Sequence, residues 1–491
     1  MNKPPRMNRN AARLSTVFLS VLLLSGCGRQ QTTREAPAEA AQRHPNVIYI
    51  MADDLGYADL GSYGQRRFRT PHIDRLAAEG MRFTDHYAGT AVCAPSRCVL
   101  ITGQHMGRAT VRGNMQWEPH GQLPLPDSVV TVAEVAKEAG YVTGMIGKWG
   151  LGISGTEGDP NVQGWDYFYG YTDQVLAHNY WPEYLVRNGE RVILDNEVQY
   201  LDSTAWHEGL GSYSTGKTQY SNDLFTDEAI AFIEREQARP FLLYLPYTIP
   251  HDNGEAPVGA RLEVPDLGSY ADEGWASDSA GYAAMIERLD GYVGRIVRTV
   301  DSLGLGENTL IVFTSDNGPM SEAQGITAFF DSNGPLRGGK RDLYEGGIRV
   351  PFVARWTGRV AAGTTSDHVS YFGDFLATVC DVAGVEPPAG TDGLSYLPEL
   401  LGESQPPHDF LYFSFYEGNK SQAVRRGRWK GVRNDVFTDP SAPWELYDLD
   451  ADLAETTDLA AQHPDEVRAL DSLARLAHHP DPFWPLLASE Q

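Results

Sequence analysis

Residues 46–54, NVIYIMADD, decide the fold, because an apolar, β-branched run ends there in two adjacent aspartates. A short run without polar alternation is typical of a strand that is buried on both faces of a parallel sheet. Three other stretches have the same form: YVTGMIGK (141–148), FLLYLPYTIPH (241–251) and NTLIVFTSDNG (308–318). We predict four buried strands, at whose ends lie Asp53, Asp54, Lys148, His251, Asp316 and Asn317.

Helical patterns lie between these runs. Apolar residues recur at three- and four-residue spacings in residues 127–140, 223–237 and 282–304. Strands that alternate with helices predict an α/β fold, in which a large, mostly parallel sheet is sandwiched by helices. Ligands bind such sheets at the carboxyl ends of the strands, so we expect the polar residues at these ends to form one site.

The sequence changes in character after about residue 390. Short apolar segments separated by turn residues, in 409–435 and 444–450, predict antiparallel strands, and residues 465–477 predict a helix. We therefore predict an α/β domain over residues 44–390 and a smaller α+β C-terminal domain over residues 391–491.

The first 43 residues have the pattern of an export signal. A basic stretch precedes the apolar run LSTVFLSVLLL, which is too short to span a bilayer comfortably. The run ends in LSGC, residues 24–27, which resembles a bacterial lipoprotein processing site. We predict a lipoprotein signal peptide over residues 1–26, a tether over 27–43, and a lipid anchor on Cys27 that holds the protein in the bacterial cell envelope (periplasm or outer-membrane surface). An ordinary signal peptide with an incidental Cys27 is the alternative.

Charge and cysteine content exclude two classes of protein. The formal net charge of −25 argues against nucleic acid as a partner, because phosphate binding requires a basic face. The chain has only four cysteines in 491 residues, which argues against a disulfide scaffold. We expect Cys98 and Cys380 to be buried free thiols.

The aspartates at the strand ends have the chemistry of a metal site. Asp53, Asp54 and Asp316, together with the amide oxygen of Asn317, are hard oxygen donors that suit Ca²⁺ or Mg²⁺. Adjacent carboxylates at a strand end are unfavourable unless a cation binds there. For the Asp–Asp pair alone, a simple turn is the alternative.

Residues 91–98, AVCAPSRC, contain a candidate nucleophile. Pro95 suits the first turn of a helix that ends at Gly103, so Cys93 lies at a helix N-terminus, where the dipole favours an anion. A thiolate nucleophile is conceivable there, although it pairs poorly with a site for a hard cation. A zinc site of Cys93 and Cys98 is disfavoured, because residues five apart do not share a helix face.

The segment CAPSR, residues 93–97, resembles the C-x-P-S-R signature of the sulfatases in the alkaline-phosphatase superfamily, and the resemblance extends over residues 46–460. It implies an alkaline-phosphatase-like fold. It also implies that a maturation enzyme oxidises Cys93 to Cα-formylglycine, whose hydrated aldehyde attacks the sulfur of a sulfated glycan or aryl sulfate.

The resemblance assigns further roles. One Ca²⁺ is expected to bind Asp53, Asp54, Asp316, Asn317 and the modified Cys93. Arg97 is expected to orient the formylglycine, Lys148 and Lys340 to bind the sulfate oxygens, and His251 to protonate the leaving alkoxide. These roles agree with chemistry in which negative charge develops on the leaving oxygen.

The sequence departs from the family at one position. Many members read G-K-W-H-L-G, whereas this chain reads GKWGLG, so Gly150 replaces a histidine that is thought to help break down the sulfated intermediate. We hypothesise that His178, which follows the aromatic and loop-like residues 164–171, compensates as a base or contacts substrate. Packing among tyrosines is the alternative for His178.

Aromatic residues suggest a carbohydrate substrate, because sugars stack on such rings, although the commoner role of aromatic residues is in the core. The residues concerned are Trp117, Trp165, Tyr167, Tyr169, Tyr171, Tyr180 and Trp181. Two other functions stay open. One is a phosphodiesterase or phosphatase of the same superfamily, which typically uses Ser or Thr and often two zinc ions. The other is a catalytically inactive, surface-anchored glycan-binding lipoprotein.

Overall fold

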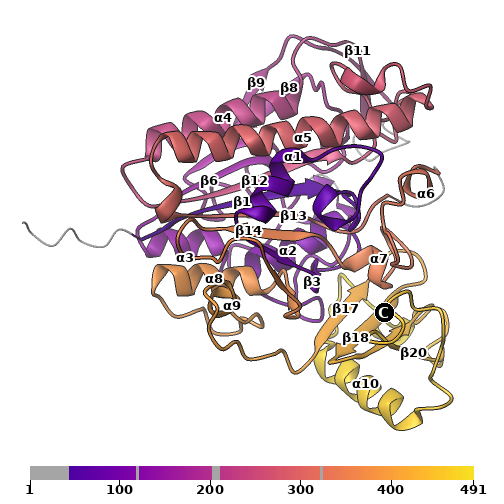
Figure 1. Cartoon of the computed structure of the whole chain (residues 1–491). Helices are drawn as coiled ribbons and strands as arrows, with labels where there is room; N and C mark the ends of the chain where they lie inside the picture. Colours follow the sequence, from indigo (N-terminus) through magenta and orange to yellow (C-terminus); the bar gives the residue numbers. More distant parts are fainter. Residues whose placement is uncertain (1–43, 118–120, 202–210, 321–324) are drawn as a thin grey trace, which may run out of the picture. The chain divides into compact units, whose positions relative to one another are not determined.

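Five parallel strands form the centre of the main sheet in this computed structural model, which describes residues 44–117, 121–201, 211–320 and 325–491 (Figure 1). In spatial order they are β13 (Thr309–Ser315), β1 (Asn46–Asp53), β12 (Phe241–Pro250), β6 (Val142–Lys148) and β7 (Tyr167–Tyr171). Every residue of β1, β12 and β13 is buried, which explains why their sequences are continuously apolar. The four predicted strands are confirmed.

Residues 164–171 were predicted to be loop-like, and this prediction is wrong, because they include the strand β7. Residues Tyr167–Tyr171 pair in parallel with residues Gly144–Lys148 of β6. The two strands pack closely at their glycines, since a Cβ atom on Gly170 would lie 1.9 Å from the carbonyl oxygen of Gly147. The many aromatic side chains obscured the strand pattern, although aromatic residues are common in strands.

Shorter strands extend the sheet at both edges, and most of them are antiparallel. One edge continues with β14 (Phe352–Arg355), β2 (Met81–Phe83) and β15 (Thr364–Ser366), and the other with β8 (Tyr184–Arg187) and β9 (Glu190–Ile193). β15 pairs in parallel with β2, whereas the other added strands pair antiparallel. The sheet is therefore mixed with a parallel centre, which confirms the predicted fold class.

Helices cover both faces of the sheet (Figure 1). On one face pack α1 (Pro71–Ala78), α4 (Ser221–Glu236) and α5 (Ser277–Ser302). On the other face pack α2 (Cys93–Thr102), α3 (Val132–Glu138) and α8 (Asp374–Ala383). The three predicted helices are present as α3, α4 and α5.

α3 begins five residues later than its pattern indicated, because Thr131 forms the N-cap. The Thr131 side chain accepts a hydrogen bond from the Glu134 amide, and the Glu134 carboxylate accepts one from the Thr131 amide. This reciprocal capping satisfies two amides that would otherwise lack partners at the helix start.

A four-stranded antiparallel sheet follows near the C-terminus, as predicted. Its strands are β17 (Leu411–Phe415), β18 (Ser421–Arg426), β19 (Trp429–Arg433) and β20 (Glu445–Asp448). The helix α10 (Pro464–Ala477) packs against β18 and β19 and shares a small apolar core with the sheet. The α+β character of this region is confirmed.

The remaining elements are short. They are β3 (His86–Tyr87), β4 (Gln116–Trp117), β5 (Gly121–Gln122), β10 (Glu197–Tyr200), β11 (Ser212–Gly216), β16 (Ser370–Tyr371), α6 (Ile326–Phe330), α7 (Glu345–Ile348) and α9 (Leu397–Leu400).

The predicted signal peptide, tether and Cys27 lie outside the described residues. Within the described ranges, no helix combines the length and the apolar character needed to cross a membrane. Cys98 and Cys380 are free and buried, as predicted.

Candidate active site

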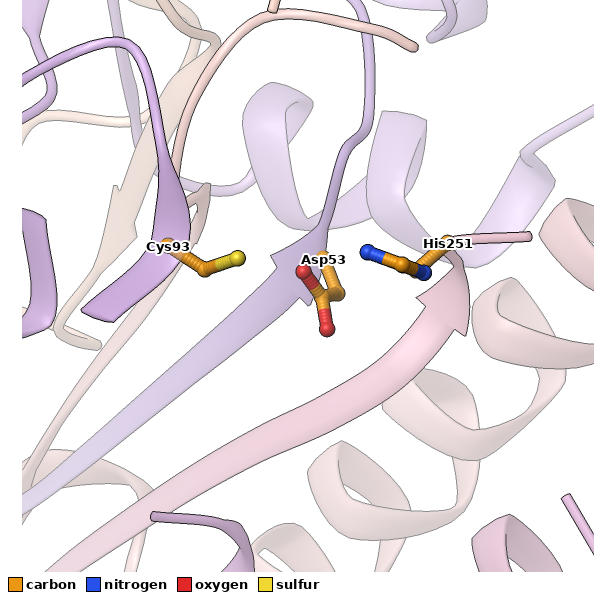
Figure 2. A group of neighbouring side chains, drawn as sticks. All are labelled: Asp53, Cys93 and His251. Atoms are coloured by element: carbon orange, nitrogen blue, oxygen red, sulfur yellow. The ribbon is translucent and has the colours of Figure 1, made fainter. Parts of the chain in front are cut away.

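The parallel strands bring the predicted polar residues to one edge of the sheet. Asp53 ends β1 and Lys148 ends β6, while His251 directly follows β12 and Asp316 directly follows β13. Figure 2 shows Asp53 and His251 at the tips of their strands, with the Cys93 side chain directed toward Asp53. Strand ends that are far apart in sequence therefore form one site.

Each of three buried carboxylates is paired with a buried cation. The pairs are Asp53 with Lys148 (2.7 Å), Asp54 with Lys340 (2.7 Å) and Asp316 with Arg97 (2.8 Å). Buried charges require such partners, because an isolated ion loses its hydration without compensation. Six of the predicted site residues are thus in direct contact.

The three carboxyl groups differ in their affinity for a proton. Burial and the neighbouring Asp53 raise the pKa of Asp316 to about 7, against the opposing effect of Arg97. Burial also raises the pKa of Asp54, although Lys340 opposes it. At Asp53, burial is outweighed by Lys148, and the pKa falls well below its ordinary value. The site therefore contains one firmly ionised carboxylate and two that hold protons more readily.

The oxygen atoms of this cluster fit a hard divalent cation. Carboxylate oxygens of Asp53, Asp54 and Asp316 lie within 4.8 Å of one another. Asp53 Oδ1 and Asn317 Oδ1 are buried and have no hydrogen-bond partner among the residues that the structure describes. Buried acceptors without partners are rare and costly, and a bound cation would satisfy them. This donor set suits Ca²⁺ rather than a soft metal.

Cys93 is the first residue of α2 and is buried. Its Sγ lies 3.9 Å from Lys148 Nζ and 3.7 Å from Asn114 Nδ2. Burial raises the pKa of the thiol, against the opposing effect of Lys148 and Lys340. A thiol that keeps its proton is a poor nucleophile, so the site does not favour a simple thiolate mechanism.

Arg97 joins three parts of the site from one turn further along α2. Its guanidinium donates to Asp316 Oδ2 from Nη2 (2.8 Å) and Nε (3.2 Å), and to the Lys148 carbonyl from Nη1 (2.5 Å). Arg97 therefore fixes the start of α2 relative to the ends of β6 and β13. Its two donors share one oxygen of Asp316, so the contact differs from the bidentate pair in which two N–H groups meet two carboxylate oxygens.

His251 and His178 lie together at the cavity. The Nδ1 of His251 donates to the carbonyl of Asp252 (2.7 Å), and its Nε2 lies 3.6 Å from Asp54 Oδ2. Burial, Lys340 and Lys148 lower the pKa of His251 well below its ordinary value. The Nδ1 of His178 is 3.0 Å from Glu255 Oε2. His178 is therefore held by a carboxylate rather than only packed among tyrosines.

A cavity of about 340 Å³ opens over these residues, and its wall includes Cys93, His178, His251 and Lys340. The wall also contains residues that no sequence pattern indicated, among them Asn114, Gln174, Glu255, Arg341 and Glu417. Arg341 directly follows the predicted site residue Lys340, and this adjacency is the only sequence feature that could have indicated Arg341. The other four lie on loops that follow no recognisable pattern, and Glu417 comes from the segment after β17.

The predicted aromatic surface for sugar stacking is wrong. Trp165, Tyr169, Tyr171, Tyr180 and Trp181 are each at most 4% exposed. Neither these residues nor Tyr167 belong to the cavity wall as the described residues define it, and the Trp117 side chain lies outside the described part. These rings form core, which is the commoner role of buried aromatic residues.

Two family models match the sequence. The model described as Sulfatase matches residues 45–385. The model described as N-sulphoglucosamine sulphohydrolase, C-terminal, matches residues 338–475.

Individual proteins resemble the chain over most of its length. It is 31% identical to the N-acetylgalactosamine-6-O-sulfatase of Bacteroides thetaiotaomicron, over 95% of this chain and 98% of that protein. It is 34% identical to arylsulfatase A of Homo sapiens, over 92% and 91%. The solved structure of Ps i-CgsB in complex with k-i-k-neocarrahexaose superposes with a TM-score of 0.75 and 26% identity, covering 91% of this chain and 96% of that chain.

Proposed function

The chain belongs to the sulfatase family, whose members are sulfuric ester hydrolases, and we propose that it hydrolyses sulfate esters of carbohydrates. The resemblance inferred from CAPSR is confirmed by the family match. The observation that carries the proposal is the cavity in which Cys93 lies beside Lys148, Lys340 and His251. A relative named as an N-acetylgalactosamine-6-O-sulfatase, and a similar structure bound to a neocarrahexaose, support a sugar substrate.

We propose that Cys93 acts after its conversion to Cα-formylglycine. One hydroxyl of the hydrated aldehyde attacks the sulfur, the S–O bond to the alcohol breaks, and the sulfate becomes bonded to the former Cys93. The second hydroxyl then loses its proton, the C–O bond to the sulfate breaks, and the aldehyde forms again. The high pKa of the unmodified thiol supports this route over direct attack by sulfur.

We propose that Lys148 and Lys340 bind the sulfate group. Lys148 Nζ lies 3.9 Å from Cys93 Sγ, and Lys340 belongs to the same cavity wall. Both ammonium groups contact aspartates, which hold them in position. Asp53, Asp54, Asp316 and Asn317 would hold Ca²⁺, which supplies further positive charge for the sulfate oxygens when bound.

His251 is the proposed acid for the leaving alkoxide. Its Nδ1–H is committed to the Asp252 carbonyl, which leaves Nε2 available to carry the transferred proton. The free site disfavours the imidazolium, because burial and two lysines lower the pKa of His251. A bound sulfate anion offsets the charge of those lysines and increases the affinity of His251 for a proton.

We also propose that the protein is an exported lipoprotein, anchored in the bacterial cell envelope through Cys27. Support comes from the basic stretch, the apolar run and LSGC at residues 24–27. For the catalytic α/β domain and the C-terminal domain, we propose the boundary near residue 390.

The test of the proposed function is turnover by protein that is made together with a formylglycine-generating enzyme. We expect release of sulfate from an aryl sulfate and from some members of a panel of sulfated mono- and disaccharides. Mass spectrometry should show Cys93 converted from thiol to aldehyde, and Cys93→Ala should abolish turnover without unfolding the protein. Phosphate-ester hydrolysis with bound zinc would instead favour the phosphatase alternative. Glycan binding without any turnover would favour an inactive binding protein.

A further inference from the structure

Gly150 and Gln174 form a complementary pair beside the cavity. Gly150 has a φ of +78°, a backbone conformation that side chains other than glycine rarely adopt. A Cβ atom at this position would lie 2.4 Å from Gln174 Oε1. The space that a side chain at residue 150 would need is therefore filled by the Gln174 carboxamide.

The backbone around Gln174 is fixed on both sides. The backbone N–H of Gln174 donates a hydrogen bond to the side-chain oxygen Oε1 of Gln122 (3.1 Å). Asp173 Oδ1 accepts from the amides of Val175 (2.8 Å) and Leu176 (3.0 Å), which lead into the short 3₁₀ helix η2 (Leu176–His178). Gln174 is consequently held in place by its main chain, without any use of its side-chain carboxamide.

Among the residues that the structure describes, that carboxamide has no hydrogen-bond partner. Gln174 is 3% exposed, and neither Oε1 nor Nε2 forms a hydrogen bond with any residue in the described ranges. Buried side-chain amides nearly always form hydrogen bonds, so this one requires an explanation. Gln174 belongs to the cavity wall together with Cys93 and Lys340, so the residue that carries the unpartnered amide lies beside the proposed sulfate site.

We propose, on the premise that the enzyme hydrolyses sulfate esters, that the Gln174 carboxamide, which occupies the space beside Gly150, binds the sulfate group. An amide donates hydrogen bonds but does not ionise at neutral pH, so Gln174 binds sulfate without acting as an acid or base. With Gly150 and Gln174, this position offers the sulfate a hydrogen-bond donor and no titratable group.

The variant Gln174→Leu tests this role, because leucine keeps most of the packing and removes the hydrogen bonds. We expect kcat/KM for a small aryl sulfate to fall about tenfold or more, as the loss of one hydrogen bond to a charged group predicts. The inhibition constant of inorganic sulfate should rise by a similar factor. The melting temperature should stay the same or rise, because an unpartnered buried amide is removed.

Gln174→Glu provides a second measurement. The carboxylate would repel sulfate, so we expect a larger loss of sulfate binding than in Gln174→Leu. Gln237→Glu, at an exposed glutamine after α4, adds the same charge at the surface and should leave kcat/KM unchanged.

Two outcomes would overturn the role of Gln174. One is unchanged kcat/KM and sulfate inhibition in Gln174→Leu, and the other is a joint loss of activity and melting temperature, which indicates a structural role. If the wild-type protein has no sulfatase turnover, the proposed function fails. Calorimetric titration of inorganic sulfate into the wild-type protein and Gln174→Leu then still decides whether Gln174 binds the anion.

Discussion

The imidazole rings of His178 and His251 stack with their centroids 4.7 Å apart and their planes inclined by 17°. The carboxylate oxygen Oε2 of Glu255 lies 3.0 Å from His178 Nδ1. The carboxylate therefore orients His178, and His178 supports the ring of the proposed acid. Gln174, rather than His178, fills the space at Gly150, and we propose that His178, which lines the cavity beside His251, contacts substrate.

We predict that His178→Ala raises KM for sulfated sugars about tenfold and has little effect on small aryl sulfates, because the lost contact is with the sugar. Steady-state kinetics on both substrate types measure this difference. Glu255→Gln, which keeps a hydrogen bond to His178, should have a smaller effect. A rapid burst of alcohol followed by slow turnover in His178→Ala would contradict substrate contact and assign the role of base to His178.

The second prediction concerns the metal. Asp316→Asn removes one negative charge from the proposed ligands while it keeps an acceptor for Arg97. We expect the variant to lose bound Ca²⁺ and to lose activity by about a hundredfold or more. Elemental analysis should find one Ca²⁺ per wild-type chain, and added Ca²⁺ should raise the melting temperature of the wild-type protein more than that of the variant. Stoichiometric zinc in the wild-type protein would contradict the calcium proposal.

The strand-end residues could be predicted from sequence for a simple physical reason. A strand inside a parallel sheet must be apolar on both faces, so the first polar residue after it is conspicuous. Asp53, Lys148, His251 and Asp316 all follow such runs. Parallel pairing of their strands then brings them together without further information.

The rest of the cavity wall could not be predicted in this way. Asn114 contacts Cys93 and accepts a hydrogen bond from the backbone amide of Ala94 (3.1 Å), which lies 20 residues earlier, in α2. Arg341 and Glu417 form an ion pair (3.1 Å) between segments 76 residues apart. Such loop contacts depend on the complete tertiary structure, and their residue types carry no periodic signal.

The third prediction concerns the pH dependence of stability. Asp59 is fully buried, and its carboxyl group accepts hydrogen bonds from Tyr282 Oη (2.6 Å) and the Gly56 amide (2.9 Å). Burial raises its pKa to about 7, and these hydrogen bonds only partly oppose the effect. In the unfolded chain the pKa of an aspartate is about 3.9. Between about pH 4 and pH 7, Asp59 is therefore protonated in the folded protein and ionised in the unfolded chain. Stability should therefore fall as the pH rises from about 4 to about 7.

Asp59→Asn should remove this dependence, because the amide cannot ionise. We expect the variant to gain stability relative to the wild-type protein between pH 5 and pH 8, by at most about 4 kcal/mol. Urea denaturation of both proteins at pH 5 and at pH 8 measures the difference in their free energies of unfolding. Asp465→Asn, at a side chain that is 86% exposed, is the matched control and should follow the wild-type protein. Parallel pH profiles for Asp59→Asn and the wild-type protein would contradict the prediction.

The fourth prediction concerns the anchor. Cys27→Ala should release the protein from bacterial membrane fractions into the soluble fraction, because the residue that would carry the lipid is removed. Ser25→Ala keeps a small residue in the LSGC segment and should leave the protein with the membranes. Fractionation and immunoblotting distinguish the two variants, and a wild-type protein that is already soluble would contradict the lipoprotein proposal.

The last prediction concerns the stability that a buried lysine of the C-terminal sheet provides. Lys430, in β19, is fully buried, and its Nζ lies 2.9 Å from Glu345 Oε1 and 2.8 Å from Glu455 Oε1. Glu345 begins α7, five residues after Lys340. The two carboxyl groups respond differently: burial raises the pKa of Glu455 to about 6, whereas Lys430 and Arg349 outweigh burial and lower that of Glu345 to about 2.

Lys430→Met should destabilise the protein by about 3–5 kcal/mol, because it leaves two buried carboxyl groups without their shared cation. The double variant Lys430→Met/Glu455→Gln should recover part of this loss, since Glu345 keeps its contact with Arg349 (3.1 Å). Arg428→Met, at a half-exposed arginine of the same sheet, should cost at most about 1 kcal/mol. Chemical denaturation compares the three variants. Equal stabilities of the single and double variants would show that the unpaired carboxyl groups are not the source of the loss.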